Sequence, residues 1–364
     1  MARIQRIGVL TAGGDCPGLN AVLRGIVKAA SFDHEIQVVG FLDGYAGLLN
    51  DRVKRLDSDT VSGILPVGGT ILGSSNRDDP FRVPVTVDGK RTFADRSEEA
   101  VRVFERYGLQ MLVVIGGDGS LTIAHQLSGK GVPVIGIPKT IDNDLAATDV
   151  SFGFDTAMTT AAEALDKLHT TAQSHHRIMV LEVMGRYAGW IALEAGLSGG
   201  GDVILLPEIP FRLDSVVGAI KERAFRGRTF TLIVISEGAK TEEGRIVVSK
   251  VVEESTDAVR LGGIGRWLAS EIEKRLETEV RVTVLGHLQR GGTPTPYDRI
   301  LGTRYGVHAA HCAAEGRRDV MVSLKGTTIT EVPLVDAVRQ LRRVDPDSQI
   351  VRAARSVGTR FGDE

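Results

Sequence analysis

The densest group of potentially reactive side chains follows an apolar run at 132–137 and reads Lys139-Thr140-Ile141-Asp142-Asn143-Asp144. It places two carboxylates and an amide at consecutive positions, directly after a segment expected to be a buried strand. One carboxylate of such a pair can accept a proton from a hydroxyl group, while the other acts on a metal ion or on transition-state charge. An Asx turn would use the same residue types, but we favour a catalytic loop.

Two glycine-rich segments follow other apolar runs and lead into expected helices. The first is Thr11-Ala12-Gly13-Gly14-Asp15, and the second is Gly116-Gly117-Asp118-Gly119-Ser120. Glycines let backbone N–H groups approach phosphate oxygens beside a helix N-terminus, and an acid among them suits Mg²⁺ held against phosphates. A plain strand-to-helix turn, or an Asp-Gly turn with a serine cap, is the alternative for each. Neither segment has the Walker spacing or the dinucleotide-binding spacing of glycines.

Cationic side chains stand at the ends of two further expected strands: Arg177, Arg186, Arg281, His287 and Arg290. A single arginine is usually a solvated surface charge. Four arginines and a histidine at strand ends are instead typical of a clamp for a phosphate ester, because a guanidinium group pairs bidentately with phosphate.

The elements that must position these residues alternate between strands and helices. Short runs rich in Val and Ile, suited to strands buried on both faces, lie at 4–10, 36–41, 111–115, 132–137, 178–183, 203–206, 231–235 and 281–285. Helices are predicted at 18–31, 98–108, 120–129, 156–172, 187–197, 213–224, 263–276, 298–314 and 333–342. This alternation predicts an α/β fold with parallel sheets covered by helices, and the length of the chain favours two lobes.

Two segments look inserted into this pattern. Residues 80–93 alternate apolar and polar side chains around Asp88-Gly89, which predicts a β-hairpin. Residues 238–262 are highly charged and are expected to leave the sheet. The tail after Arg343 is expected to be partly helical.

The composition is that of an ordinary globular protein, with 364 residues, 42% apolar residues and a formal net charge of −2. Such a charge argues against a nucleic-acid or anionic-membrane partner. The two cysteines, Cys16 and Cys312, lie far apart without a Cys/His cluster, so neither a disulfide framework nor a structural zinc site is indicated. No run of 18 apolar residues occurs, and no leader segment is apparent. We therefore expect a cytoplasmic protein that acts on small molecules.

Taken together, the motifs resemble those of the 6-phosphofructokinase family. They occur in the family's order as GGD with PG.N, GGTILGS, IGGDGS, PKTIDND, SHHRI with EVMGR, ISEG and LGHLQRGG, and they extend from about residue 4 to 310. The resemblance implies two lobes, each a mainly parallel sheet flanked by helices, with the active site between them. It assigns residues 1–152 plus about 288–318 to a phosphoryl-donor lobe, and 153–287 plus about 319–364 to a fructose 6-phosphate lobe.

The resemblance also implies roles for individual residues. The donor site would comprise Gly14, Arg77, Gly117, Asp118, Gly119, Ser120 and Lys139, with Asp118 binding Mg²⁺. The sugar phosphate site would comprise Thr140, Asp142, Arg177, Met184, Gly185, Arg186, Glu237, Arg281, His287 and Arg290. Asp142 would be the base on the sugar 1-hydroxyl, with Thr140 and Asp144 beside the transferring phosphoryl group and Arg186 neutralising its charge.

The resemblance further implies that the 6-phosphate is bound by residues from two subunits. His287 and Arg290 would hold the 6-phosphate, joined by Arg177 and Arg281 from a neighbouring subunit. Shared sites imply a homo-oligomer, at least a dimer, and family members are usually tetramers.

For the phosphoryl donor, two diagnostic positions point to different implications. Pyrophosphate-using relatives carry Asp where this chain has Gly119 and Lys where it has Lys139, whereas typical bacterial ATP enzymes carry Gly at both. A carboxylate at position 119 would repel the α-phosphate of ATP, so Gly119 predicts ATP, with pyrophosphate as the alternative. Bacterial ATP enzymes often place an arginine directly after LGSA, whereas here Asn76 precedes Arg77.

Two readings from other functional classes are weaker. A non-catalytic sensor of phosphosugars or nucleotides would have no need of a base, yet Asp118, Asp142 and Arg186 are all present. An NAD-dependent oxidoreductase would need the dinucleotide-binding glycine motif and a ribose-binding acid after it, and the chain has neither in that context.

Overall fold

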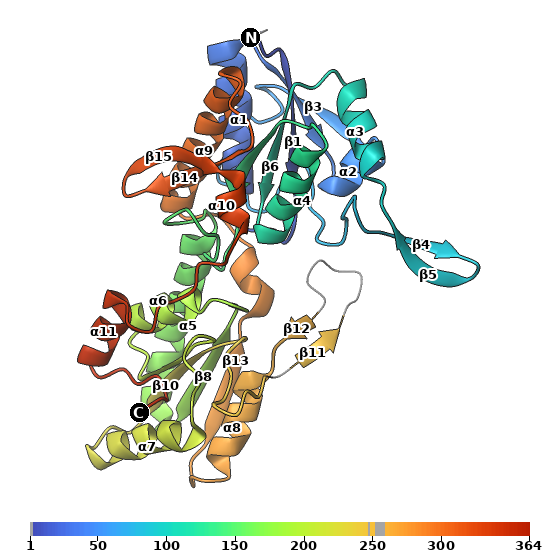
Figure 1. Cartoon of the computed structure of the whole chain (residues 1–364). Coiled ribbons are helices and arrows are strands. Elements are labelled where there is room, and N and C mark those ends of the chain that lie inside the picture. Colours follow the sequence, from blue (N-terminus) through green and yellow to red (C-terminus); the bar gives the residue numbers. More distant parts are fainter. Residues whose placement is uncertain (1–2, 247, 252–258) are drawn as a thin grey trace.

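The computed structural model describes residues 3–246, 248–251 and 259–364. It forms two α/β lobes, one above the other in Figure 1. The strands of the upper lobe's main sheet are β1 (Arg6–Thr11), β2 (Gln37–Phe41), β3 (Val53–Leu56), β6 (Met111–Gly116), β7 (Val134–Pro138), β14 (Val320–Lys325) and β15 (Thr328–Pro333). Those of the lower lobe's sheet are β8 (Ile178–Val183), β9 (Val203–Leu205), β10 (Thr231–Ser236) and β13 (Val280–Val284).

The helices fill the connections. They are α1 (Leu19–His34), α2 (Tyr45–Leu49), α3 (Ser97–Arg106), α4 (Asp118–Gly129), α5 (Phe154–His175), α6 (Trp190–Ser198), α7 (Leu213–Phe225), α8 (Ile264–Glu273), α9 (Pro296–Ala314), α10 (Leu334–Val338) and α11 (Gln349–Ser356), with the 3-10 turn η1 (Gly286–Arg290). Each of the eight expected strands and nine expected helices is present, with ends that differ by a few residues, except that the helix predicted at 333–342 stops at Val338.

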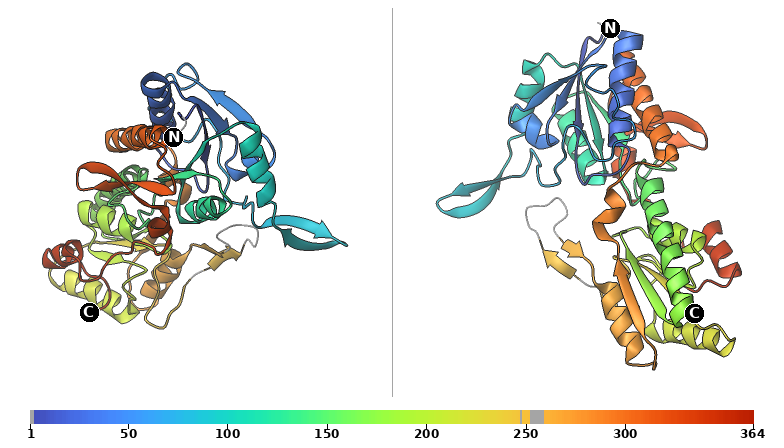
Figure 2. Two further views of the ribbon diagram at one scale, coloured as in Figure 1. Left: turned by 45° about the horizontal axis from the view of Figure 1, so that its top comes forward. Right: turned by 180° about the vertical axis from the view of Figure 1, so that it is seen from behind.

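The upper sheet has the strand order β15-β14-β7-β6-β1-β2-β3 and is parallel from β2 to β14. Its central strands are buried along their whole length, because side chains alternate between two covered faces. One face packs Val113 and Ile135 against α1 and α9. The other packs Val114 and Val134 against α3, α4 and α10. Figure 2 shows this three-layer arrangement from two other directions.

The lower sheet, β13-β8-β10-β9, is parallel throughout. The same alternation applies here, with Leu181 and Val234 facing α5 and α6, and Val180 and Ile233 facing α7 and α8. Both lobes thus confirm the α/β class predicted from the continuous apolar runs.

Two antiparallel hairpins extend from the lobes on the same side of the molecule (Figures 1 and 2). The first, β4 (Val83–Val87) and β5 (Lys90–Ala94), turns at Asp88 and Gly89 with φ of 51° and 73°. Both turn residues are thus in the left-handed region that two-residue hairpins require, which confirms the prediction for 80–93. The second, β11 (Val248–Val251) and β12 (Val259–Leu261), lies in the charged segment 238–262, of which residues 247 and 252–258 are outside the described residues.

One expectation about the lobes is wrong. We assigned about 319–364 to the lower lobe, but β14 pairs with β7 and β15 pairs with β14, so this hairpin completes the upper sheet. The reason is that β7 would otherwise end the sheet with an unpaired edge. The part of the tail that packs on the lower lobe is α11 with the residues on either side of it, where Val351 and Phe361 are fully buried.

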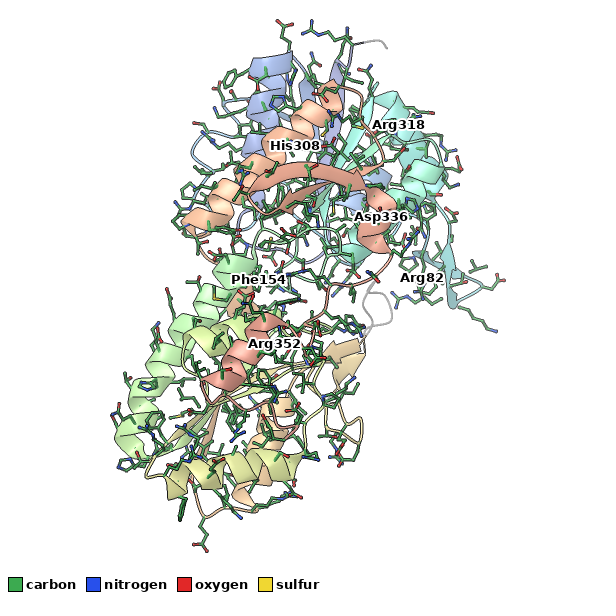
Figure 3. All side chains as sticks on the ribbon, turned by 60° about the vertical axis from the view of Figure 1, so that its left-hand side comes forward. Arg82, Phe154, His308, Arg318, Asp336 and Arg352 are labelled. Atoms are coloured by element: carbon green, nitrogen blue, oxygen red, sulfur yellow. The ribbon has the colours of Figure 1, made fainter. Side chains whose placement is uncertain are left out.

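The lobes are joined where α9 meets α5. The side chain of Asp298, in the first turn of α9, accepts hydrogen bonds from the backbone N–H groups of Gly153 (2.9 Å) and Thr156 (2.8 Å) and from the Thr156 hydroxyl (2.6 Å). It thereby occupies the N-terminus of α5, the helix whose first residue, Phe154, is labelled in Figure 3. Burial raises the pKa of Asp298 to about 6, despite these hydrogen bonds.

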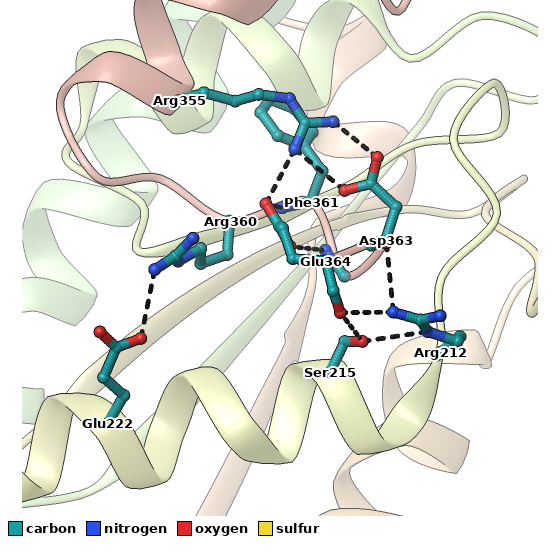
Figure 4. A network of polar contacts seen from close by, with 9 residues as sticks. Arg212, Ser215, Glu222, Arg355, Arg360, Phe361, Asp363 and Glu364 are labelled. Carbon is teal, nitrogen blue, oxygen red and sulfur yellow. Dashed lines mark hydrogen bonds and ion pairs between the residues drawn. The ribbon is translucent and has the colours of Figure 1, made fainter.

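The segment after α11 is fixed by a network on α7 (Figure 4). Arg355 pairs with Asp363 (2.6 Å) and Glu364 (2.8 Å), and its guanidinium lies 4.8 Å from the centre of the Phe361 ring. Gly362 allows the close approach, because it has φ of 79° and a Cβ there would lie 2.8 Å from Phe211. The ion pairs are partly exposed and contribute little, so burial of Phe361 is the main anchor.

Phe361→Ala should therefore lower the free energy of unfolding by about 3–5 kcal/mol, because it leaves a cavity at a fully buried position. The matched control is Val357→Ala, also beyond α11 but 75% exposed, which should change this free energy by less than about 0.5 kcal/mol. Urea denaturation followed by circular dichroism measures both. Equal effects of the two substitutions would contradict the packing described here.

Candidate active site

The carboxyl ends of β1, β6 and β7 meet at one edge of the upper sheet, since the three strands are adjacent and parallel. The glycine turn after β1 is held there by a second loop. The N–H of Gly13 donates to the carbonyl of Ser75 (2.9 Å), and the hydroxyl of Ser74 donates to the carbonyl of Gly13 (2.6 Å). Gly13 has φ of 83°, which favours glycine. The turn is therefore an ordered cradle.

The segment Gly117–Ser120 forms the N-terminus of α4 beside this cradle. Gly117 is the N-cap, Asp118 is exposed in the first turn and Ser120 is buried. A Cβ on Gly13 would lie 3.1 Å from the Ser120 hydroxyl oxygen, so the glycine turn and the helix terminus are in contact. Unpaired N–H groups at a helix N-terminus attract phosphate. The two predicted glycine segments thus form one surface, on which the N-terminus of α4 could attract an anion.

Lys139 lies beneath this surface. It is buried, and its ammonium group donates to the carbonyl of Gly14. Burial lowers its pKa, with a smaller contribution from Arg290 in the same direction. The amino group is therefore held under the glycine turn by the carbonyl of Gly14, while burial disfavours its positive charge.

Arg77 lies next to the loop that holds the glycine turn. It is exposed, and its N–H donates to the Ser75 hydroxyl (3.3 Å). Gly119 is half-buried in the first turn of α4. The predicted donor-site residues are therefore gathered at one edge.

The loop after β7 carries the two predicted catalytic carboxylates. The Thr140 hydroxyl donates to Asp144 (3.0 Å) and accepts from the N–H of Asp142 (3.1 Å). Between these residues Asn143 has φ of 54°, and its side chain accepts from the N–H of Ser151 (3.0 Å). One carboxylate oxygen of Asp142 is shielded from solvent and accepts no hydrogen bond from any residue in the described part of the chain.

The surroundings of this loop raise the pKa values of both carboxyl groups. Burial, opposed by Arg290 and reinforced by Glu237 and Asp118, raises the pKa of Asp142 to about 6. Burial and the charge of Asp142 raise the pKa of Asp144 to about 7. An unpartnered carboxylate oxygen among like charges fits a site that receives a hydroxyl proton and a divalent cation.

Residues at the carboxyl ends of the lower strands face the same region. Met184, Gly185 and Arg186 follow β8, Glu237 follows β10, and His287 and Arg290 lie in η1 after β13. Gly185 has φ of 129°, and its carbonyl accepts from the Ser236 hydroxyl. The Arg186 guanidinium lies 4.9 Å from the ring centre of Tyr187.

Arg290 connects the two sets of strand ends. Its guanidinium donates to the carbonyl of Asp15 (3.0 Å), and a Cβ on Gly14 would lie 2.6 Å from the same nitrogen. It also acts electrostatically on Asp142 and Lys139. The predicted sugar-phosphate arginine therefore contacts the glycine cradle and acts electrostatically on the predicted base, Asp142, of the same chain.

Two predicted residues are not brought to this region. Arg177 precedes β8 and Arg281 is the second residue of β13, so both lie at the opposite ends of these strands from Arg186 and Arg290. Six residues of strand span roughly 20 Å. Both arginines contact the carboxylate of Glu279 instead. Within a single chain they cannot reach the site that their own strands build.

Two residues that support the loops of the glycine cradle were not among the site residues predicted from the sequence. The buried side chain of Asn20 donates to the carbonyl of Val67 (3.0 Å) and accepts from the N–H of Ile71 (2.9 Å). The Tyr45 hydroxyl donates to the carbonyl of Ser120 (2.7 Å). Asn20 could have been noticed as a polar residue on the apolar face of the helix predicted at 18–31. No feature of the sequence singles out Tyr45.

Comparisons with known proteins agree with this geometry. The family described as "Phosphofructokinase" matches residues 6–313. An "ATP-dependent 6-phosphofructokinase 2" of Clostridium perfringens is 52% identical over the whole length of both chains. A "Pyrophosphate--fructose 6-phosphate 1-phosphotransferase" of Streptomyces coelicolor is 48% identical over 94% of this chain and 97% of its own.

A solved structure, phosphofructokinase of Pichia pastoris in the T-state, superposes with a TM-score of 0.80 at 30% identity. It covers 98% of this chain, which spans 39% of that longer polypeptide. In the described residues, no helix is long and apolar enough to cross a membrane. The profile match over most of the chain and the identity along its whole length establish that this protein belongs to the phosphofructokinase family.

Proposed function

We propose that this protein is an ATP-dependent 6-phosphofructokinase, a phosphotransferase that converts fructose 6-phosphate to fructose 1,6-bisphosphate in glycolysis. The observation that carries the proposal is the shielded, unpartnered oxygen of Asp142 beside a glycine cradle and the guanidinium of Arg290. A base, a phosphate cradle and a cation at one point are what transfer of a phosphoryl group to a hydroxyl requires. We assign the enzyme to the cytoplasm.

In the proposed reaction, Asp142 takes the proton of the sugar 1-hydroxyl. At the same time, the hydroxyl oxygen forms a bond to the terminal phosphorus of ATP, and the bond between that phosphorus and the oxygen of the leaving ADP breaks. Thr140 holds Asp144 and the backbone of Asp142 in place. Arg186 offsets the negative charge on the transferring group. Mg²⁺, when bound through Asp118, supplies positive charge for the donor phosphates. Met184, Gly185 and Glu237 contact the sugar.

ATP is proposed as the donor on two grounds. First, because residue 119 is glycine, Asp118 is the acidic residue in the first turn of α4. Second, the relatives at 52% identity are named ATP-dependent. The Streptomyces coelicolor relative named for pyrophosphate is nearly as similar, so identity alone does not separate the donors.

We further propose that the enzyme is a dimer or tetramer with shared sites. Arg177 and Arg281 are partly exposed at the strand ends remote from their own active site, where Glu279 holds them. From there they can bind the 6-phosphate in the active site of a neighbouring, identical subunit. In that site they would act together with His287 and Arg290 of the neighbouring copy.

The donor is tested by steady-state assays with fructose 6-phosphate and either ATP or pyrophosphate. We expect kcat/KM to be at least tenfold higher for ATP, which corresponds to about 1.4 kcal/mol, and Gly119→Asp should lower the value for ATP selectively. EDTA should abolish turnover, and Mg²⁺ should restore it. A tenfold preference for pyrophosphate would overturn the donor assignment.

The role of Asp142 is tested with Asp142→Asn, which keeps the shape but removes the basic oxygen. The variant should lose roughly 10²–10⁴ in kcat with little change in either KM. In the wild type, kcat/KM should fall as pH drops below about 6, because the raised pKa of Asp142 leaves it protonated there. Arg290→Ala, which removes a phosphate contact, should mainly raise KM for fructose 6-phosphate. A wild-type kcat in Asp142→Asn would refute this mechanism.

Shared sites are tested by mixing two inactive variants, Asp142→Asn and the double variant Arg177→Ala/Arg281→Ala. Hybrid oligomers would contain sites with an intact base and intact neighbouring arginines, so part of the activity should return. Each variant mixed with itself is the control, and fluorescently labelled subunits report exchange. Exchange without any gain of activity would show that the arginines do not complete a neighbour's site.

A further inference from the structure

The segment between α10 and α11, residues 339–348, passes from the upper lobe to the lower lobe, and we call it the strap. In Figure 1 it runs as a red trace beside the junction of the lobes, and in Figure 3 Asp336 of α10 and Arg352 of α11 mark its two ends. The sequence predicted a helix up to residue 342. The helix stops earlier because the N–H of Arg342 donates to the carbonyl of Asp144 (2.8 Å).

The strap contacts the catalytic loop at three points. Besides this backbone hydrogen bond, the Arg342 guanidinium donates to the carbonyl of Asn143 (3.2 Å), and Leu341 forms an antiparallel bridge with Leu145. Arg342 therefore binds two consecutive carbonyl groups directly after Asp142.

The strap also holds the loop that carries Arg186. The Arg342 guanidinium lies 4.1 Å from the ring centre of Trp190, whose indole N–H donates to the carbonyl of Arg342 (3.1 Å). Next to this contact, the carboxylate of Glu208 accepts from the N–H groups of Val344 (2.8 Å) and Gly189 (3.0 Å). One segment thus connects the loops of both lobes.

The catalytic loop needs such support for two physical reasons. Asn143 is in the left-handed region at φ of 54°, a conformation that costs energy for a residue with a side chain. The carboxyl groups on either side of it, Asp142 and Asp144, repel each other when ionised. A cation fixed to the carbonyl of Asn143 stabilises the turn without contacting either carboxylate.

We propose that Arg342 is a positioning residue of the reaction, which fixes the Asn143–Asp144 backbone and thereby aims Asp142 at the sugar hydroxyl. Arg342 does not touch the substrate in this proposal. The inference rests on the proposed role of Asp142, because it concerns how that base is held.

The test begins with Arg342→Ala, compared with Arg343→Ala on the same strap, where the side chain is exposed. Misplacement of a catalytic group by about 1 Å can cost roughly 10²-fold in rate. We therefore expect Arg342→Ala to lower kcat by about 10- to 100-fold with less than a threefold change in either KM, and Arg343→Ala to stay within twofold of wild type. If Arg342→Ala does not fold, Arg342→Lys takes its place, because lysine keeps the charge but lacks the planar group that binds Asn143 and stacks on Trp190. A loss of threefold or more in kcat is expected for it.

A double variant separates positioning from a general loss of structure. If Arg342 acts through Asp142, then Asp142→Asn/Arg342→Ala should be about as slow as Asp142→Asn alone, because the base is already absent. A structural defect would instead multiply the two losses. Multiplied losses, or an unchanged kcat in both Arg342 variants, would overturn the proposal. If instead Asp142→Asn keeps full kcat, the proposed base is wrong, an outcome distinct from failure of the strap.

Discussion

The buried negative charge at the end of β7 sets the requirements that the rest of the site meets. Asp144 is buried and one carboxylate oxygen of Asp142 is shielded from solvent, and the pKa values of both groups rise because burial and neighbouring carboxylates disfavour ionisation. A base is useful only when it is ionised, so positive charge must approach from elsewhere. Lys139, directly after β7, lies beneath the glycine cradle, and Arg290 approaches from η1 after β13. Both lower the pKa of Asp142, so the site as proposed depends on strand ends of both sheets.

Strand direction explains which residues can meet. All strands of the lower sheet run parallel, so their carboxyl ends form one edge that faces the upper lobe and their amino ends form the other. The same topology that brings Arg186 and Arg290 to the junction takes Arg177 and Arg281 away from it. Glu279 lies between those two arginines and reduces the repulsion between their charges. This position, remote from their own strand ends, is the observation on which the proposed phosphate site shared with a second chain rests.

The parts that could be predicted from the sequence are those fixed by local pattern. Continuous apolar runs ending in glycine located the eight parallel strands and their chemically active ends, and Asp88-Gly89 located a hairpin. The hairpin β14–β15 was assigned to the wrong lobe, because an edge strand is chosen by long-range pairing that its own residues do not encode. Arg342 gave no signal at all. It lies in a polar tail rich in arginine, and its importance depends on which carbonyl groups the folded chain places beside it.

Gly119 is typical of ATP-using enzymes and Lys139 of pyrophosphate-using relatives, but the two residues have different surroundings in the structure. Lys139 is buried below the cradle, and its ammonium group is engaged by the carbonyl of Gly14. A lysine in this position supports the shape and charge of the glycine turn, which any phosphate donor would use. Gly119 lies instead in the first turn of α4, where unpaired N–H groups would attract the phosphates of a donor bound as proposed and a side-chain carboxylate would repel them. In the proposed donor site, position 119 is therefore the one on which discrimination between ATP and pyrophosphate should depend.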